Sequence, residues 1–289
     1  MPSFYSQLKS LINKRKQQIG LLVVLVILIT ACSVEGKIAK QKLANTKFRA
    51  MIIGPEFIHK LSLKSDSLTK ADSLRIGNID SLLYFESDIV QYIDDSIFIN
   101  LCLNNMMKEL ISNYNVTLYK PDSPYELLPD STFVLNFAEM EMEEFQYKEN
   151  YEYFDDFGSP HYFDIDVTAI NLNTWFELQY KTPSNDLFPV LYSSFFHYDD
   201  EELDINTLLG KNDRSNDTIN RAVISAYRSA ADYGKIYASY FYDYMLNVKI
   251  NDLIPEGKKQ NFYMHYDYKT KRTYPIYEGM FIELDINPQ

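Results

Sequence analysis

The sequence is poor in the residues on which many recognisable catalytic and cofactor sites depend. Its 289 residues include only 9 glycines, 2 cysteines, 4 histidines and 1 tryptophan. Scarce glycine argues against glycine-rich loops that cradle phosphate groups. The chain has neither a His-Glu-x-x-His metal motif nor a Gly-x-Ser-x-Gly nucleophile elbow. No catalytic class is therefore indicated by a motif.

Basic residues are also in the minority. The formal net charge is −12, and all four Lys and Arg of residues 1–31 precede an apolar run. Without those residues, 24 Lys and Arg stand against 40 Asp and Glu, a net charge of −16. This acidity argues against nucleic acid and against anionic lipid headgroups as partners.

The first 32 residues carry the clearest signal in the chain. A basic segment ending at Lys16 is followed by the apolar run Ile19–Ile29 and then by Thr30-Ala31-Cys32. The run is about a dozen residues long, which is too short for a membrane-spanning helix and fits the apolar region of a secretory signal.

This arrangement resembles the signal peptide and lipobox of bacterial lipoproteins, and those of Bacteroidota in particular. The resemblance implies lipidation of Cys32 after cleavage at Ala31, and hence attachment to a membrane of the cell envelope, the outer membrane being expected. Glu35 is the only acidic residue in Ser33–Lys37. That departs from the acidic cluster of surface-exposed Bacteroidota lipoproteins and favours a periplasm-facing position. An uncleaved signal anchor is the alternative.

We therefore expect a signal peptide at 1–31, a tether at 32–46 and a single domain at 47–289. If Cys32 is lipidated, no intramolecular disulfide can form. The remaining thiol, Cys102, lies in the apolar stretch Ile97–Leu103 and is expected to be a buried small hydrophobe.

Apolar periodicity indicates two main helices, one from Asp95 or Ser96 to about Asn113 and one from an N-cap at Asp217 to about Leu246. Ser62–Asp80 is either a short amphipathic helix or an exposed loop. Strands are expected at 47–53, 115–119, 132–145, 161–179 and 187–198, with a bulge near Asn171 or Asn173 and a terminal hairpin of 260–267 with 274–286.

This order predicts an α+β fold, a mostly antiparallel sheet with both helices packed on one face. It is loosely similar, in element order only, to accessory lipoproteins of lipid-transport systems.

Acidic residues alternate along the expected strand 132–145. Glu139, Glu141 and Glu143 would share one face at spacings of roughly 6.6 Å. If Tyr147–Pro160 closes a hairpin, Asp164 and Asp166 return beside Glu143 and Glu141. Such like charges would be relieved by a divalent cation, with Ca²⁺ the candidate ligand. Two solvated strand ends are the alternative, and otherwise no cofactor is expected.

Aromatic residues gather in the segment between those two strands. We interpret that segment as a loop and its aromatics as a contact surface, because a loop need not bury them in its own core. The residues concerned are Tyr147, Tyr151, Tyr153, Phe154 and Phe157.

Together these features predict a membrane-anchored, non-catalytic binding or scaffold component with an envelope protein as partner. The alternatives are a lipid-anchored glycan or peptidoglycan hydrolase with two carboxyl groups about 5–9.5 Å apart, and a cation-dependent binding module.

Overall fold

The computed structural model describes residues 47–63, 87–154, 157–181, 189–198, 216–252, 263–277 and 280–284. The signal peptide, the tether and nearly all of Ser62–Asp80 lie outside these residues. The chain divides into two compact units, Lys47–Tyr244 with Gly279–Gln289, and Met1–Thr46 with Met245–Glu278. The single domain expected at 47–289 stays a prediction.

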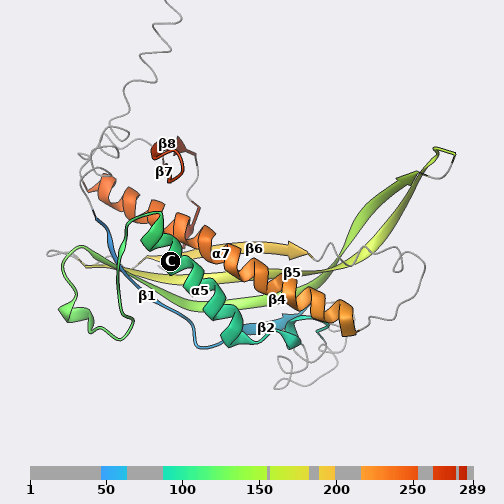
Figure 1. Ribbon diagram of the computed structural model, residues 1–289, viewed down its shortest axis with the longest axis horizontal. Coiled ribbons are helices and arrows are strands. Elements are labelled where there is room, and N and C mark those ends of the chain that lie inside the picture. Colours follow the sequence, from blue (N-terminus) through green and yellow to red (C-terminus); the bar gives the residue numbers. More distant parts are fainter. Residues whose placement is uncertain are drawn as a thin grey trace, which may run out of the picture. The chain divides into compact units, whose positions relative to one another are not determined.

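The larger unit is built on a seven-stranded sheet in the order β3-β1-β4-β5-β6-β9, with β2 also paired to β4 (Figure 1). The strands are β1 (Arg49–Ile53), β2 (His59–Ser62), β3 (Thr117–Tyr119), β4 (Thr132–Phe154), β5 (Pro160–Tyr180), β6 (Val190–Tyr198) and β9 (Ile282–Leu284).

The sheet is mixed, so the expectation of a mostly antiparallel sheet is wrong. β1 runs parallel to both β3 and β4, and β2 runs parallel to β4. Parallel neighbours need a crossover connection, usually a helix. Helix α5 (Asp95–Ser112) lies in the connection from β1 to β3 and serves that role. The fold class, α+β, is confirmed.

Helices α5 and α7 (Asn216–Asn251) lie across the same face of this sheet (Figure 1). Aromatic rings fill the layer between α7 and the sheet. The ring of Tyr237 lies 5.8 Å from that of Phe137 on β4 and 5.1 Å from that of Phe176 on β5, and all three are buried. The Tyr237 hydroxyl donates to Thr174 Oγ1 at 2.8 Å, so the buried phenol is satisfied.

The two helices touch through a glycine. A Cβ on Gly234 of α7 would lie 2.1 Å from the carbonyl oxygen of Cys102 on α5. Cys102 is buried as expected, and burial raises the pKa of its thiol to about 12. Close approach of two helix backbones at a small residue therefore sets the spacing of the helical layer.

The irregularity of the sheet lies on a different strand from the one expected. The register of β4 against β5 shifts between Phe137 and Glu139, so the bulge predicted near Asn171 or Asn173 is wrong. Before the shift the odd-numbered residues of β4 face the helices, and after it the even-numbered ones do. Phe137 is buried on one side of it, and Met140 and Met142 are buried on the other. An extra residue in one strand has this effect on alternation.

The interpretation of Tyr147–Pro160 as a loop is also wrong. β4 and β5 stay paired as far as Phe154 and Pro160. Gly158, with φ of 78°, adopts the left-handed conformation that glycine tolerates, within the short turn. The two strands therefore form a long ribbon, drawn at the upper right of Figure 1.

The smaller unit contains a separate two-stranded sheet of β7 (Tyr263–Asp267) and β8 (Arg272–Ile276). The expected terminal hairpin is thus partly correct, but residues 282–284 pair with β6 instead. Asn247, near the end of α7, donates to the Met264 carbonyl at 2.8 Å and accepts from the Met264 N–H at 2.9 Å. Among the described helices, none is both long and apolar enough to cross a membrane.

We expect Gly234→Ala to destabilise the protein although alanine is the better helix former. The added methyl group has no room against the Cys102 backbone, and overpacking of this kind typically costs about 1–3 kcal/mol. Chemical denaturation measures the change. The control is Arg228→Ala at an exposed position of the same helix, which should change stability little; a Gly234→Ala protein as stable as this control would contradict the close contact.

Candidate binding surface

The face of the sheet opposite the helices carries an ordered set of polar residues. β4 supplies Glu139, Glu141 and Glu143, β5 supplies Asn171, Asn173 and Trp175, and β6 supplies Tyr192 and Ser194. We call these eight residues the polar grid. The register pairs Glu139 with Trp175, Glu141 with Asn173 and Glu143 with Asn171. It likewise pairs Trp175 with Tyr192 and Asn173 with Ser194, so the grid runs across three strands.

Two asparagine amides hold the grid together. Asn173 Nδ2 donates to Glu141 Oε1 and to Glu143 Oε2, both at 3.0 Å. Asn171 Nδ2 donates to Glu143 Oε2 at 3.1 Å and to Asn173 Oδ1 at 3.0 Å. On the other side, the Tyr192 hydroxyl donates to Asn173 Oδ1 and the Ser194 hydroxyl to Asn171 Oδ1, each at 2.8 Å.

Asn173 is therefore the centre of the grid. It is only 6% exposed, and its amide uses both N–H donors and both acceptor lone pairs. The two glutamate oxygens each lie 3.0 Å from the same nitrogen, so they are at most about 6 Å apart. The carboxylate oxygens are acceptors, so a ligand on this face would have to offer hydrogen-bond donors or positive charge.

The structure corrects the expected pairing of the acidic residues. Asp166 pairs with Lys148 and Asp164 with Asn150, several residues farther along the ribbon than Glu143 and Glu141. The two aspartates therefore do not return beside the glutamates, because β4 and β5 stay paired as far as Phe154 and Pro160. Asparagines occupy the positions where carboxylates were expected.

The cation hypothesis itself stays a prediction. Glu139 Oε1 lies 3.7 Å from Nε2 of His59 on β2. Glu141 and Glu143 both accept hydrogen bonds from the Asn173 amide. No group of three His, Cys, Asp or Glu side chains placed to hold a metal occurs in the part of the chain that the structure describes.

Aromatic rings lie within the grid and beside it on the same face. The rings of Trp175 and Tyr192 lie 5.2 Å apart, and those of Phe145 and Phe196 lie 5.7 Å apart where the ribbon leaves the sheet. Phe196 is about half exposed. This face of the sheet is therefore partly aromatic and partly acidic.

The end of the ribbon exposes further aromatics. Phe154 is 63% exposed, Phe157 94% and Tyr162 67%. The Tyr162 hydroxyl donates to Glu152 Oε1 at 2.8 Å, and this bond to a carboxylate raises the pKa of the tyrosine. The side chains of the other three predicted contact residues, Tyr147, Tyr151 and Tyr153, lie outside the described part of the structure.

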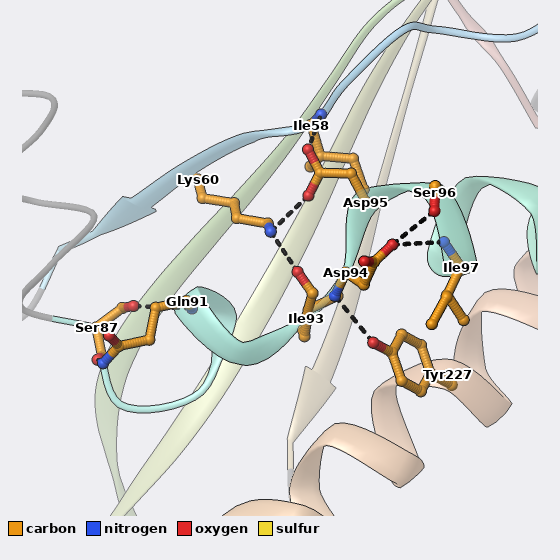
Figure 2. Close-up of polar contacts among 10 residues, drawn as sticks. All are labelled: Ile58, Lys60, Ser87, Gln91, Ile93, Asp94, Asp95, Ser96, Ile97 and Tyr227. Carbon is orange, nitrogen blue, oxygen red and sulfur yellow. Dashed lines mark hydrogen bonds and ion pairs between the residues drawn. The ribbon is translucent and has the colours of Figure 1, made fainter.

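A second polar cluster joins β2 to the start of α5 (Figure 2). Lys60 pairs with Asp95 and also donates to the Ile93 carbonyl, while the Ile58 N–H donates to Asp95 Oδ2 at 3.0 Å. Asp94 caps the helix, accepting from the Ser96 hydroxyl and the Ile97 N–H, and these bonds hold its pKa below the ordinary value. The Asp94 N–H in turn donates to the Tyr227 hydroxyl on α7 at 2.9 Å.

This cluster is a structural junction, because its charges are matched within the fold. Sequence reasoning expected the cap at Asp95 or Ser96 and missed Lys60. It also missed Glu144, a fully buried carboxylate that accepts from the N–H groups of Asp88, Ile89 and Val90 at 2.7–3.1 Å. The signal that was missed is the alternation of β4 after the register shift. Every second residue from Met140 to Glu144 lies on the buried side, and Glu144 follows Met142 in that series.

Comparison with known proteins adds no assignment: no family model, no curated protein and no solved structure matches the chain.

We expect Asn173→Asp to destabilise the protein at neutral pH by about 1–3 kcal/mol, because the donors are lost and a third carboxylate joins Glu141 and Glu143. Repulsion raises the pKa of the new group above its unfolded value, so the deficit should shrink as the pH falls and protonation removes the charge.

Urea unfolding at several pH values between 4 and 8 measures this dependence. Ser194→Ala, which removes one bond at the exposed rim of the grid, serves as the control and should cost less. An Asn173→Asp deficit that does not change with pH would contradict the described network.

Proposed function

We propose that this chain is a lipid-anchored component of the bacterial cell envelope that binds or scaffolds another envelope component and is not a catalyst. The observation that carries the binding role is the β4–β5 ribbon, which presents Phe154, Phe157 and Tyr162 to solvent at its end. Clustered exposed aromatics are uncommon on a protein surface unless they serve an interaction.

The anchor rests on the amino-terminal signal. The order of basic residues, apolar run and Thr30-Ala31-Cys32 supports lipidation of Cys32. One acyl chain binds a membrane marginally, whereas two or more anchor it stably. A tether of residues 32–46, if extended, could reach about 50 Å from the membrane surface.

The helical side of the sheet supports the non-catalytic reading. Between α5, α7 and the sheet remains a void of only about 10 Å³, lined by apolar side chains that include Phe98, Met142 and Tyr233. At this place the interior is filled by the protein's own side chains.

The second candidate, a glycan hydrolase, draws on the Glu141 and Glu143 pair. The two oxygens that accept from Asn173 are at most about 6 Å apart, a bound that reaches only the lower end of the carboxylate separations of about 5 to 9.5 Å that glycoside hydrolysis uses. Both oxygens, however, accept hydrogen bonds from the Asn173 amide, and neither is placed to donate a proton to a leaving group.

We expect Cys32→Ala to move the protein from the membrane fraction to the soluble fraction and to abolish incorporation of labelled palmitate, because the acylated thiol is lost. Cys102→Ala is the matched control: it removes the other cysteine, which is buried, and should keep both membrane attachment and label.

Retention of the Cys32→Ala protein in membranes would contradict the anchor. Turnover of peptidoglycan fragments by the wild-type protein that Glu141→Gln abolishes would favour the hydrolase over the binding role.

A further inference from the structure

The hairpin of β7 and β8 lies in a segment whose charge is opposite to that of the rest of the chain. Residues 257–277 hold five Lys and Arg against one Asp, whereas the chain from Cys32 to Gln289 has a net charge of −16. The acidity of the whole chain argues against anionic lipid headgroups as partners, but this segment has the opposite sign. A basic patch on an acidic protein marks the place where an anionic surface is attracted.

Three of the five cations are gathered at the tip of the hairpin. Lys269 and Lys271 lie in the turn between the strands, Arg272 begins β8, and all three are exposed. Within the described part of the chain, none of the three side chains forms an ion pair with a carboxylate. Their charge is therefore available to a partner outside the fold.

The acidic residue of the hairpin is engaged in its own turn. Asp267 Oδ2 accepts from the Thr270 hydroxyl at 2.7 Å, and Oδ1 accepts from the Lys269 N–H at 2.9 Å. These bonds, that from Thr270 above all, hold the pKa of Asp267 below its ordinary value. Arg272 lies opposite Asp267 in the register, yet the carboxylate bonds to the turn and not to the guanidinium. Asp267 therefore shapes the turn that presents the three cations.

Tyrosines accompany these cations. Tyr274 on β8 is 45% exposed and Tyr277 just beyond it is 88% exposed. The Lys269 ammonium lies 5.9 Å from the centre of the Tyr268 ring. Tyrosine combines an apolar ring with a polar tip, and together with Lys and Arg it is favoured at the boundary between water and lipid. The composition of the hairpin therefore fits a membrane surface.

The expected tether and the hairpin are joined to the same end of α7. The ring of Phe48, which follows the tether, lies 5.3 Å from that of Tyr242. Asn247, five residues farther along the helix, bonds to both backbone polar groups of Met264 in β7. A tether of residues 32–46 reaches at most about 50 Å. An anchored chain thus meets the headgroups of its own membrane at a high effective concentration.

We infer that the β7–β8 hairpin is a membrane-contact site, in which Lys269, Lys271 and Arg272 bind anionic headgroups of the membrane that holds the lipid anchor. Each Lys or Arg near such a surface strengthens attachment on the order of fivefold. The same surface repels the acidic remainder of the chain, so both effects favour an orientation with the hairpin toward the lipid. This inference rests on the proposed lipid anchor and adds the surface that orients the anchored chain.

The test compares lysine acetylation in the full-length, lipidated protein reconstituted into two kinds of vesicle, phosphatidylcholine alone and phosphatidylcholine mixed with phosphatidylglycerol. Mass spectrometry measures the modification of Lys269 and Lys271, with the exposed Lys108 and Lys120 of the larger unit as internal controls. We expect Lys269 and Lys271 to react several-fold more slowly in the anionic vesicles and the two controls to react equally in both. The difference should disappear when salt is raised to roughly 0.5 M.

Two variants test the contribution of the tip. Arg272→Gln removes one of its cations, and Arg228→Gln at an exposed position of α7 is the matched control. Arg272→Gln should make Lys269 react several-fold faster in the anionic vesicles, because one of three attractive charges is lost. Arg228→Gln should leave that rate unchanged. Equal rates for all three proteins in phosphatidylcholine vesicles show that the turn is retained.

Equal rates for Lys269 and Lys271 in the two kinds of vesicle, or equal slowing of Lys108 and Lys120, would overturn the inference. So would protection by soluble polyphosphate as strong as that by the anionic vesicles, because the site would then bind free polyanions. Flotation of the same vesicles separates the two proposals. A protein that does not float contradicts the anchor, whereas a floated protein with an unprotected hairpin contradicts the membrane contact alone.

Discussion

The pairing of β4 with β5 is the constraint on which the rest of this structure depends. Beyond the shift at Phe137 and Glu139, one unbroken antiparallel register runs from Glu139–Trp175 to Phe154–Pro160. That register brings Asn173 between Glu141 and Glu143, turns Glu144 into the buried layer, and places Tyr162 opposite Glu152 on the ribbon. A slip by one residue would exchange every one of these positions between faces. The two asparagines therefore also favour this register, because their amides pair with the glutamates only in it.

The helices fill one side of the sheet. Gly234 lets α7 approach the backbone of α5 at Cys102, and the aromatic residues of α7 fill the space above the sheet. The long tyrosine-rich helix is thus explained largely by the core. The opposite face is different: near β1 it is covered by the apolar cluster of Met51, Leu128 and Val134, and toward the ribbon it becomes the polar grid. The acidic and partly aromatic surface of the polar grid begins beyond this apolar cluster.

Sequence reasoning succeeded where a local pattern decides the structure. The apolar spacing of residues 98–110 located α5 to within a residue or two, although the cap is Asp94 and not the expected Asp95 or Ser96, and the burial of Cys102 followed from its neighbours. Parallel pairing of β1 could not be predicted, since it depends on where the chain returns after α5. The strands of the ribbon were mistaken for a loop because Asp155, Asp156 and Gly158 signal a turn but do not say how short it is. Because of this error in turn length, the predicted positions of Asp164 and Asp166 were wrong, and the pairing of Asn171 and Asn173 with the glutamates of the polar grid was missed.

Cross-strand disulfide trapping tests the register most directly. In a chain with Cys32→Ala, one variant would carry Lys148→Cys with Asp166→Cys and a second would carry Lys148→Cys with Asp164→Cys; Cys102 is buried and its pKa is raised, so it should not compete. Directly opposite residues have Cβ atoms about 4.5–5.5 Å apart, close to disulfide distance, whereas diagonal ones are about 7–8 Å apart. The account predicts rapid oxidation of the 148–166 pair and little of the 148–164 pair. Preferential oxidation of the 148–164 pair would contradict the register, and with it the polar grid.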